Sequence, residues 1–401
     1  MTVQSSDAPV ILAGSEKGSH AGNSVSTQVL FDALSARWPV DTVGHRTGLL
    51  PSLTGARIPG GVRWTLTTQP LTPHLEGFPA AAAFRRRFHH VRAGWVVNSR
   101  YAALPMTARI PYVLWEATTL SDEMAATSGA ASRRAGLGTG VGATLHQALL
   151  PLNRKVERLS YQRAAVLLAM SEHTRNCMIA EHGLAPERVT CLPHPPTREY
   201  LGTLDAVRGS QARQPLGTAL RLLFVGRVDD PRKNFELLSA AYRQARARGV
   251  AASLTVIGRH TARWRSNIEL DETRDDVRFR GSVPVDELVR AYLSHDLLVI
   301  SSRQEGFGIV VAEALHAGLP VLSTRCGGPE DTIASSRGGV LVEQDAATFS
   351  EALERLARER AALSAMGERG RSWAARELSF DRFAERVAAI TEQVLARPRQ
   401  P

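Results

Sequence analysis

Short apolar runs alternate with longer amphipathic stretches along this chain, and the alternation constrains its fold more than any other feature. Runs such as 9–13, 166–170 and 297–300 are apolar throughout rather than at every second residue, which is typical of strands covered by helices on both faces. The stretches between the runs carry apolar residues at helical spacing. The sequence therefore predicts an α/β protein with parallel sheets.

The same pattern predicts two doubly wound halves. Further strands are predicted at 95–98, 111–115, 189–192, 222–225, 254–257, 320–323 and 340–342, and helices at 24–37, 234–248, 285–295 and 349–360. Between the halves, residues 202–217 are rich in Gly, Gln, Arg and Pro and have little hydrophobic periodicity, which is typical of a linker. We predict an N-terminal domain over 1–200, a linker over 201–218, a C-terminal domain over 219–378 and a terminal helix over 379–401.

Composition narrows the class of protein. The chain has 401 residues, of which 43% are hydrophobic, and this excludes global disorder. The formal charge of +10 comes from arginines scattered over the whole length, so we expect a solvated surface and no nucleic-acid partner. The three cysteines, Cys177, Cys191 and Cys326, lack the paired spacing of disulfides or zinc sites. The first ten residues lack the basic and apolar regions of a signal peptide, and no window is apolar over the length of a membrane span. We therefore expect a cytoplasmic protein.

Two strand ends carry candidate binding residues, because ligands of open α/β sheets lie at the carboxyl ends of the strands. The first follows strand 297–300 and contains Glu305, Gly306, Phe307, Gly308, Ile309, Val310 and Glu313. Its glycines let a ligand approach the backbone, and the helix start offers free N–H groups to an anion. The two carboxylates can accept hydrogen bonds from pairs of sugar hydroxyls. The alternative is an ordinary helix start with two satisfied carboxylates.

The second strand end follows strand 222–225, where Gly226 and Arg227 open a loop that ends at Lys233. Lys233 is one of three lysines in the chain and stands at a predicted helix start, where a cation is unfavourable. A residue whose position is unfavourable for local structure is a candidate for a functional role. Together Arg227 and Lys233 can offset the charge of a diphosphate. The alternative is a surface loop with two solvated cations.

These segments resemble a known family. Glu305 and Glu313 have the E-x7-E spacing, and residues 305–321 look like the signature of retaining glycosyltransferases of family 4, also called glycosyltransferase group 1. Residues 224–227 with Lys233 and Asn234 are similar to that family's diphosphate-binding segment, and residues 326–330 resemble its loop after the next strand. The resemblance implies a GT-B fold, in which two Rossmann-like domains face each other across a cleft and the C-terminal helix crosses back to the first domain.

The resemblance also implies roles. Glu305 would hold hydroxyls of the donor sugar, and Glu313 would bind the ribose diol. The backbone of residues 306–310 would lie along the sugar and phosphate. Arg227 and Lys233 would stabilise the leaving diphosphate, so Arg227, Lys233 and Glu305 form the predicted catalytic set.

Four further residues are predicted around the nucleotide sugar. Gly226 lies beside the diphosphate and Gly281 near the nucleobase. In the loop after the first strand, Gly22 and Asn23 match the position from which the family's loop meets the donor phosphates; the alternative is a plain turn. The glycine spacing of this loop differs from G-x-G-x-x-G, which argues against a nicotinamide or flavin cofactor.

Two features of the first half leave alternatives open. Glu116 follows strand 111–115, where many family members have a histidine; it either faces the acceptor or caps the helix around Ser121. The basic segment 84–90 (FRRRFHH) is either a solvated helix face or a contact with anionic lipid or a phosphorylated acceptor. No D-x-D pair or Walker A loop occurs, so no metal is predicted.

We therefore predict a metal-independent glycosyltransferase without a cofactor, which moves a sugar from a nucleotide-diphosphate sugar to an acceptor hydroxyl with retention. The acceptor is a glycan, a lipid or a secondary metabolite, and a lipid acceptor would add weak peripheral contact with the inner membrane face. The alternatives are a sugar-nucleotide epimerase or hydrolase of related fold and a non-catalytic partner subunit of a glycosyltransferase. The presence of both glutamates and both cations argues against the latter.

Overall fold

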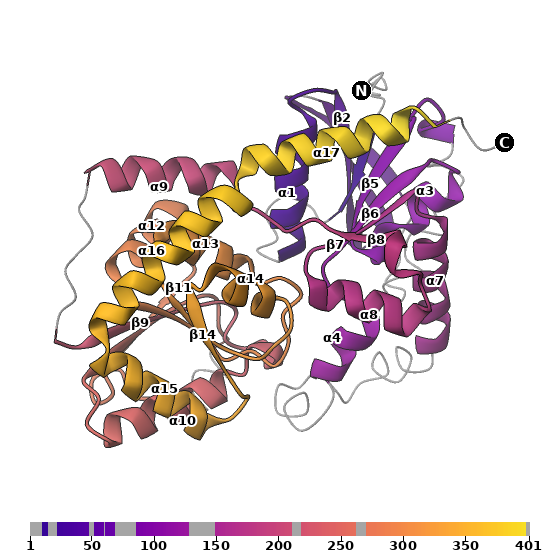
Figure 1. The fold of residues 1–401 in the computed structure, drawn as a ribbon. Helices are drawn as coiled ribbons and strands as arrows, with labels where there is room; N and C mark the ends of the chain where they lie inside the picture. The colour runs from indigo at the N-terminus through magenta and orange to yellow at the C-terminus, as the bar shows by residue number, and fades with distance from the viewer. Residues whose placement is uncertain are drawn as a thin grey trace. The chain divides into compact units, whose positions relative to one another are not determined.

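Two parallel-rich sheets organise the chain, one in each of two units (Figure 1). The first unit comprises Met1–Ser121, Thr139–Thr197 and Phe380–Pro401, and the second comprises Asp122–Gly138 and Arg198–Ser379. The computed structural model describes residues 10–14, 22–47, 52–59, 61–68, 86–127, 149–210, 218–261 and 270–397. Within these ranges, each helix is too short or too polar to cross a membrane.

The described strands of the first sheet have the order β3-β4-β2-β1-β5-β6-β7-β8. They are β1 (Val10–Ala13), β2 (Val40–Thr47), β3 (Ser52–Ile58), β4 (Gly61–Thr68), β5 (Ala93–Val97), β6 (Tyr112–Glu116), β7 (Val166–Ala169) and β8 (Val189–Cys191). Neighbouring strands run parallel except β3 and β4. Every residue of β1, β5 and β6 is buried, which explains their continuously apolar sequences.

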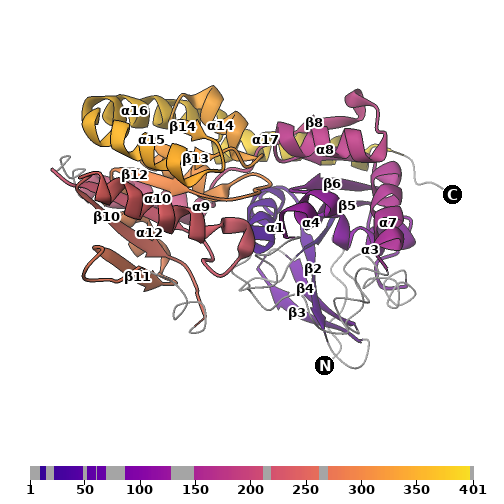
Figure 2. The ribbon, with the colours of Figure 1, turned by 90° about the horizontal axis from the view of Figure 1, so that it is seen from below.

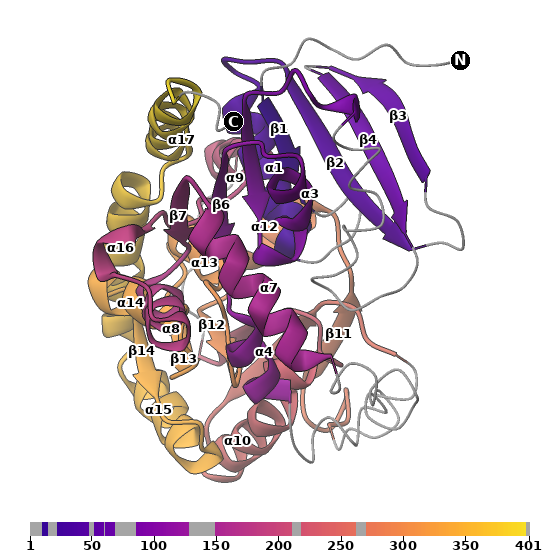
Figure 3. The same ribbon diagram turned by 90° about the vertical axis from the view of Figure 1, so that its right-hand side faces the viewer.

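The hairpin of β3 and β4 extends this sheet at one edge (Figure 3) and was not predicted. Its strands alternate polar and apolar residues and contain no long apolar run. The buried carboxylate of Asp41 on β2 accepts hydrogen bonds from the Val62 amide at 3.0 Å and the Trp64 indole at 3.1 Å. Asp41 therefore fixes β4 against β2 through contacts that a local sequence window does not reveal.

The helices of the first unit surround this sheet. Those that the structure describes are α1 (Gly22–Leu34), α3 (Ala103–Thr107), α7 (Leu150–Arg163), α8 (Glu172–His182) and α17 (Phe380–Leu395), with short 3₁₀ turns η2 (Ser99–Tyr101) and η3 (Pro186–Arg188). Helix α4 (Leu120–Thr127) begins at the end of the first unit and belongs to the second unit from Asp122 onward.

The C-terminal helix α17 is part of the first unit and lies beside α1 (Figure 1). The Trp95 indole of β5 donates a hydrogen bond to the Thr391 hydroxyl at 3.0 Å. The ring of Phe383 lies 5.2 Å from that of Trp115 on β6, measured between centroids. Because these side chains are buried, α17 completes the core over two central strands, as the family resemblance implies.

The second sheet has the order β11-β10-β9-β12-β13-β14, with β11 at one edge (Figure 2). Its strands are β9 (Leu220–Val225), β10 (Ala252–Ile257), β11 (Val277–Gly281), β12 (Leu297–Ile300), β13 (Val321–Thr324) and β14 (Gly339–Val342). Its helices are α9 (Arg198–Ser210), α10 (Phe235–Ala247), α12 (Val285–Ser294), α13 (Ile309–Ala317), α14 (Pro329–Ser336), α15 (Ala346–Arg358) and α16 (Arg360–Glu377), with the 3₁₀ turn η4 (Pro231–Lys233). All described strand pairs of this sheet are parallel.

Apolar side chains cover both faces of the second sheet. Helices α10 and α15 share one core cluster with residues of β9 and β10. Helices α9, α12 and α13 share the other with residues of β9, β12 and β13. This layering is the doubly wound arrangement that the sequence predicts, and it brings the carboxyl ends of β9 and β12, which are neighbours, to one edge.

The predicted linker over 201–218 is wrong for its first ten residues, because 201–210 continue helix α9. Tyr200, Leu204 and Val207 of α9 are buried in the second unit. Their spacing of four and three residues is helical, but Gly202 and Gly209 between them suggested a loop.

Candidate functional site

The loop after β9 is built around a buried carboxylate. Asp230 caps η4 and accepts hydrogen bonds from the Arg232 amide at 3.0 Å and from the Arg232 guanidinium at 2.9 Å. It also pairs with Arg227. Burial opposes ionisation of Asp230, but the hydrogen bonds and charge of Arg232, with the charge of Arg227, lower its pKa to about 2. Asp230 therefore holds the loop in one conformation at neutral pH.

Lys233 ends this loop and contacts the loop after β12. Its Nζ lies 2.6 Å from Oε1 of Glu305, and the same oxygen accepts a hydrogen bond from the Ser302 hydroxyl at 2.6 Å. The Lys233 carbonyl accepts from the Ser301 hydroxyl at 2.8 Å. The side chains of Lys233 and Glu305 are 21% and 13% exposed, so both are held in place and both remain reachable by a ligand.

Glycines bring three strand ends of this sheet close together. A Cβ on Gly258, after β10, would lie 1.7 Å from the carbonyl oxygen of Gly226, which no side chain permits. The Gly258 amide donates to the carbonyl of Gly281, at the end of β11, at 2.8 Å. At Gly226 the Cε of Lys233 would be 3.6 Å from an added Cβ, so the lysine stem passes directly over that glycine.

The loop of residues 306–308 leads into α13 and is clamped to a second loop. The Glu305 amide donates to the Cys326 carbonyl at 2.7 Å, and the Gly328 amide donates to the Glu305 carbonyl at 2.8 Å. Gly308 precedes α13 with φ of 81°, which favours glycine, and no side chain caps the helix. The amides of Ile309 and Val310 have no intrahelical partner by their position in the first turn. This backbone is suited to an anion.

Glu313 lies one turn further along α13, on the side of α12. Its Oε2 accepts a hydrogen bond from the Tyr292 hydroxyl at 2.8 Å, and the Tyr200 hydroxyl donates to its carbonyl at 2.7 Å. Burial raises the pKa of Glu313 to about 7, and the Tyr292 hydrogen bond acts in the opposite direction. Glu313 is thus a carboxylate that already has one partner and two lone-pair positions left on Oε1.

The structure brings some of the predicted residues together and separates others. Lys233 pairs directly with Glu305 and its stem lies beside Gly226, whereas Arg227 is 45% exposed and pairs with Asp230. Gly22 and Asn23 form the first turn of α1 in the first unit. The side chain of Asn23 lies outside the described residues.

The structure shows Glu116 in neither of its two predicted roles, facing the acceptor or capping a helix. It is fully buried at the end of β6, so it is not open to an acceptor in this structure, and it does not cap α4 because the Leu120 amide donates to Glu157. The Ser99 amide donates to Glu116 Oε2 at 2.8 Å, and the Tyr161 hydroxyl lies 3.3 Å from the same atom. Burial, and then the charge of Glu157, raise the pKa of Glu116 to about 8.

The basic segment 84–90 is described from Arg86 onward. Phe88 is buried against Trp64, with ring centroids 5.6 Å apart, and the Arg87 guanidinium lies 4.5 Å from the centroid of the Trp64 ring. Phe88 and Arg87 therefore pack on β4. Arg86 and His89 of the same segment are exposed.

Sequence reasoning did not find Asp230, which holds Arg227 and Arg232, or Ser302, whose hydroxyl donates to Glu305. A signal for Asp230 existed, because an Asp directly before Pro231 matches a 3₁₀ or helix start. Ser302 carried no comparable signal, since its contact depends on the turn between residues 302 and 305.

Comparisons with known proteins show which proteins the chain is similar to. Residues 219–359 match the model of the family described as glycosyl transferases group 1. The chain is 27% identical over 250 residues to the GDP-mannose-dependent alpha-(1-6)-phosphatidylinositol monomannoside mannosyltransferase of Mycobacterium tuberculosis, an alignment that spans 60% of this chain and 65% of that one. It is 33% identical over 125 residues to a D-inositol 3-phosphate glycosyltransferase of Corynebacterium urealyticum, spanning 31% of this chain and 29% of the other.

The whole chain is similar in structure to sucrose-phosphate synthase from Thermosynechococcus elongatus, with a TM-score of 0.75, 19% sequence identity and coverage of 97% of this chain and 99% of that one. The chain therefore has the GT-B fold of glycosyltransferases. Its resemblance to glycosyltransferase group 1, carried by residues 219–359, is confirmed.

Proposed function

We propose that this chain is a retaining glycosyltransferase that takes its sugar from a nucleotide-diphosphate donor bound by the second unit. The observation that carries the proposal is the ion pair of Lys233 and Glu305 at 2.6 Å, between the loops after two neighbouring strands. A cation for the diphosphate and a carboxylate for the sugar are thus held side by side at the sheet edge where such folds bind ligands.

Donor binding would replace the ion pair with contacts to the ligand. A diphosphate oxygen would take the place of Glu305 beside Lys233, and Glu305 would turn its oxygens to the sugar hydroxyls. The free amides of Ile309 and Val310 would add donors for the phosphate or sugar oxygens. Fixed donors and charges lower the barrier most where negative charge develops, which here is the leaving diphosphate.

The acceptor hydroxyl must lose a proton during transfer. Glu116 is fully buried, so it is not placed to take this proton. We propose that the leaving phosphate takes this proton, so attack and departure occur on the same face of the sugar and the anomeric configuration is retained. Analysis of the product's anomeric configuration by NMR tests this step: an inverted product contradicts it.

The donor charge would be offset by Lys233, Arg227 and helix amides without a metal. We therefore expect EDTA to leave turnover unchanged. Loss of activity with EDTA that Mg²⁺ restores would contradict the metal-independent mechanism.

A screen of donors is the first experiment. The mannosyltransferase relative makes GDP-mannose the first donor to try, followed by UDP-glucose and other nucleotide sugars. A binding donor raises the midpoint of thermal unfolding, since it binds only the folded state. Inositol-containing and other hydroxyl acceptors are then supplied. If the acceptor is a lipid, we expect the reaction in the cell to take place at the cytoplasmic face of the membrane. Release of nucleoside diphosphate without any acceptor, or an epimerised donor, would favour the hydrolase or epimerase alternative.

A further inference from the structure

The two oxygens of the Glu305 carboxylate have unequal surroundings. Two donors share Oε1: Nζ of Lys233 lies 2.6 Å from it, and the Ser302 hydroxyl donates a hydrogen bond to it at 2.6 Å. Among the described residues, the structure gives Oε2 no hydrogen-bond partner. One oxygen of Glu305 is therefore held twice, and the other is left for a ligand.

The two donors differ in how firmly they are fixed. Lys233 reaches Glu305 through a long flexible stem, and its side chain is 21% exposed. Ser302 is 1% exposed, and its carbonyl accepts a hydrogen bond from the buried Thr324 hydroxyl at 2.6 Å. Ser302 thus holds Oε1 from a fixed point of the loop after β12, whereas Lys233 can turn to another anion.

The backbone of this turn has hydrogen-bond partners other than the Ser302 hydroxyl. Serine hydroxyls in turns usually bond to nearby backbone groups. Here the Glu305 amide donates to the Cys326 carbonyl at 2.7 Å, and the Glu305 carbonyl accepts from the Gly328 amide at 2.8 Å. Among the described contacts, the Ser302 hydroxyl therefore holds only the side chain of Glu305.

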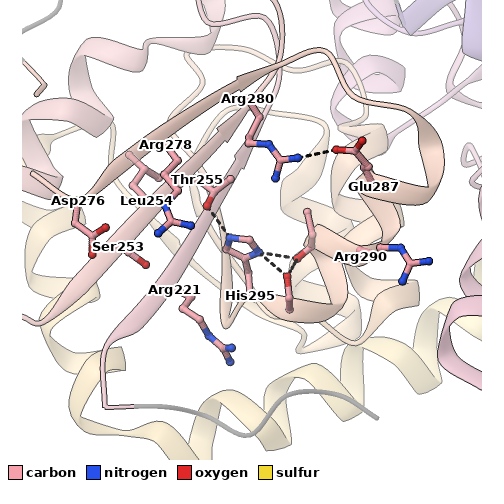
Figure 4. Close-up of a pocket in the computed structure, with 12 residues that line it drawn as sticks. Arg221, Ser253, Leu254, Thr255, Asp276, Arg278, Arg280, Glu287, Arg290 and His295 are labelled. Atoms are coloured by element: carbon pink, nitrogen blue, oxygen red, sulfur yellow. Dashed lines mark hydrogen bonds and ion pairs between the residues drawn. The ribbon is translucent and has the colours of Figure 1, made fainter. Parts of the chain in front are cut away.

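His295 shows the contrasting case of a side chain that the protein holds at both of its polar atoms. It lines a hollow of about 660 Å³ between β10, β11 and α12 (Figure 4). Its Nδ1 lies 2.7 Å from the Ala291 carbonyl, and its Nε2 lies 2.9 Å from the Thr255 hydroxyl. Such a ring is fixed by the fold alone. Glu305 is held at one oxygen only, as a group that must bind a ligand with the other.

We propose that Ser302 is a positioning residue, which keeps Glu305 directed at the donor sugar after Lys233 has turned to the diphosphate. The inference rests on the proposed glycosyltransferase function. Because the Ser302 side chain is buried, the diphosphate does not draw it away as it draws Lys233. With Oε1 held by the serine, Oε2 meets a sugar hydroxyl from a fixed direction, and fixed orientation of this kind lowers the barrier to reaction.

The competing explanation is that Ser302 only stabilises the loop. In that case its loss would lower the melting temperature and weaken diphosphate binding together with turnover. Its effect would also be the same whether or not Glu305 is present, because changes that act independently add.

Steady-state kinetics of Ser302→Ala with the identified donor tests the proposal. We expect kcat to fall by about 10- to 100-fold, the effect of losing a hydrogen bond to a charged group. Donor KM should stay within about threefold of the wild type, because Lys233 and the helix amides still bind the diphosphate. Ser302→Thr retains the hydroxyl and should keep more of the turnover than Ser302→Ala.

Ser336→Ala is the matched control. Ser336 is a buried serine on α14, and its hydroxyl donates to the Ile333 carbonyl three residues earlier, at 3.2 Å. Its loss removes a buried hydroxyl of the same unit and should leave kcat unchanged. Melting temperatures and calorimetric titration of the nucleoside diphosphate show that each variant is folded and binds.

A double mutant separates positioning from plain stabilisation. If Ser302 acts through Glu305, adding Ser302→Ala to Glu305→Ala should change turnover by less than about twofold. The inference is overturned if Ser302→Ala keeps wild-type kcat, if Ser302→Thr loses as much turnover as Ser302→Ala, or if the serine substitution has its full effect without Glu305. Failure of the proposed function gives a different result, since Glu305→Ala then keeps full turnover or the wild type transfers no sugar from any nucleotide donor.

Discussion

Glu116 and Glu305 both stand at or just beyond the carboxyl end of a central parallel strand, yet their surroundings are opposite. Glu116 is sealed in the core beside a second carboxylate, Glu157, and receives hydrogen bonds from Ser99 and Tyr161. Glu305 is partly open and pairs with Lys233 at 2.6 Å. A position after a strand is therefore insufficient to define a site. What distinguishes the two is whether the following turn carries the side chain outward beside a cation.

The largest expected effect comes from removing that cation. Lys233→Ala should lower turnover by about 100- to 1,000-fold, the range for losing one preorganised charge at a developing anion. Arg227→Ala should lower it less, because Arg227 is 45% exposed and already pairs with Asp230. Steady-state kinetics with the identified donor measure both. Full activity in Lys233→Ala with an unchanged melting temperature would contradict its role.

Glu313 should act on donor affinity. Its proposed contact with the ribose is made equally before and during reaction, so its loss mainly raises KM or donor Kd. For Glu313→Gln we expect nucleoside diphosphate to bind about 10- to 100-fold more weakly. Calorimetric titration of the diphosphate measures the change. Tyr292→Phe, which removes only the hydrogen bond to Oε2, should have a smaller effect.

Glu305 should act on the chemical step instead. Glu305→Ala frees Lys233 from its ion pair, so the diphosphate should bind at least as well as to the wild type. Turnover should fall, because the contact with the reacting sugar is lost, and discrimination between epimeric donor sugars should change. If Glu305→Ala loses diphosphate binding while Glu313→Gln keeps it, the two roles are reversed.

The smallest effect on activity is expected at Glu116. Its folded-state pKa of about 8 lies above the usual value of 4.5, so its proton stabilises the folded state at low pH. That contribution is lost as pH rises through about 8. Glu116→Gln should therefore keep its turnover. Between pH 6 and pH 9 the melting temperature of the variant should fall less than that of the wild type. The difference should be about 2–4 °C for each kcal/mol of stability that the variant retains.

Thermal unfolding across pH measures this difference, and Glu343→Gln controls for loss of an exposed carboxylate. Equal dependence on pH in wild type and Glu116→Gln would contradict the shifted pKa. A large loss of turnover in Glu116→Gln would restore Glu116 as a site residue and remove the contrast with Glu305.

The sequence was sufficient for features set by local chemistry. The apolar runs predicted the central strands to within a few residues, and the E-x7-E spacing located α13 and its preceding loop. Features that depend on distant partners were not predictable in the same way. The burial of Glu116 depends on Tyr161, 45 residues away, and the β3–β4 hairpin depends on the carboxylate of Asp41.

The position of α17 has a consequence for how the protein is made. Domains usually fold in the order in which the ribosome releases them. Here the first unit begins with β1 but its core includes Phe383 and Thr391, which are translated after the whole of the second unit. Until α17 emerges, the Trp95 indole therefore lacks the Thr391 hydroxyl and the Trp115 ring lacks Phe383. The core of the first unit is thus completed only after the second unit has been synthesised.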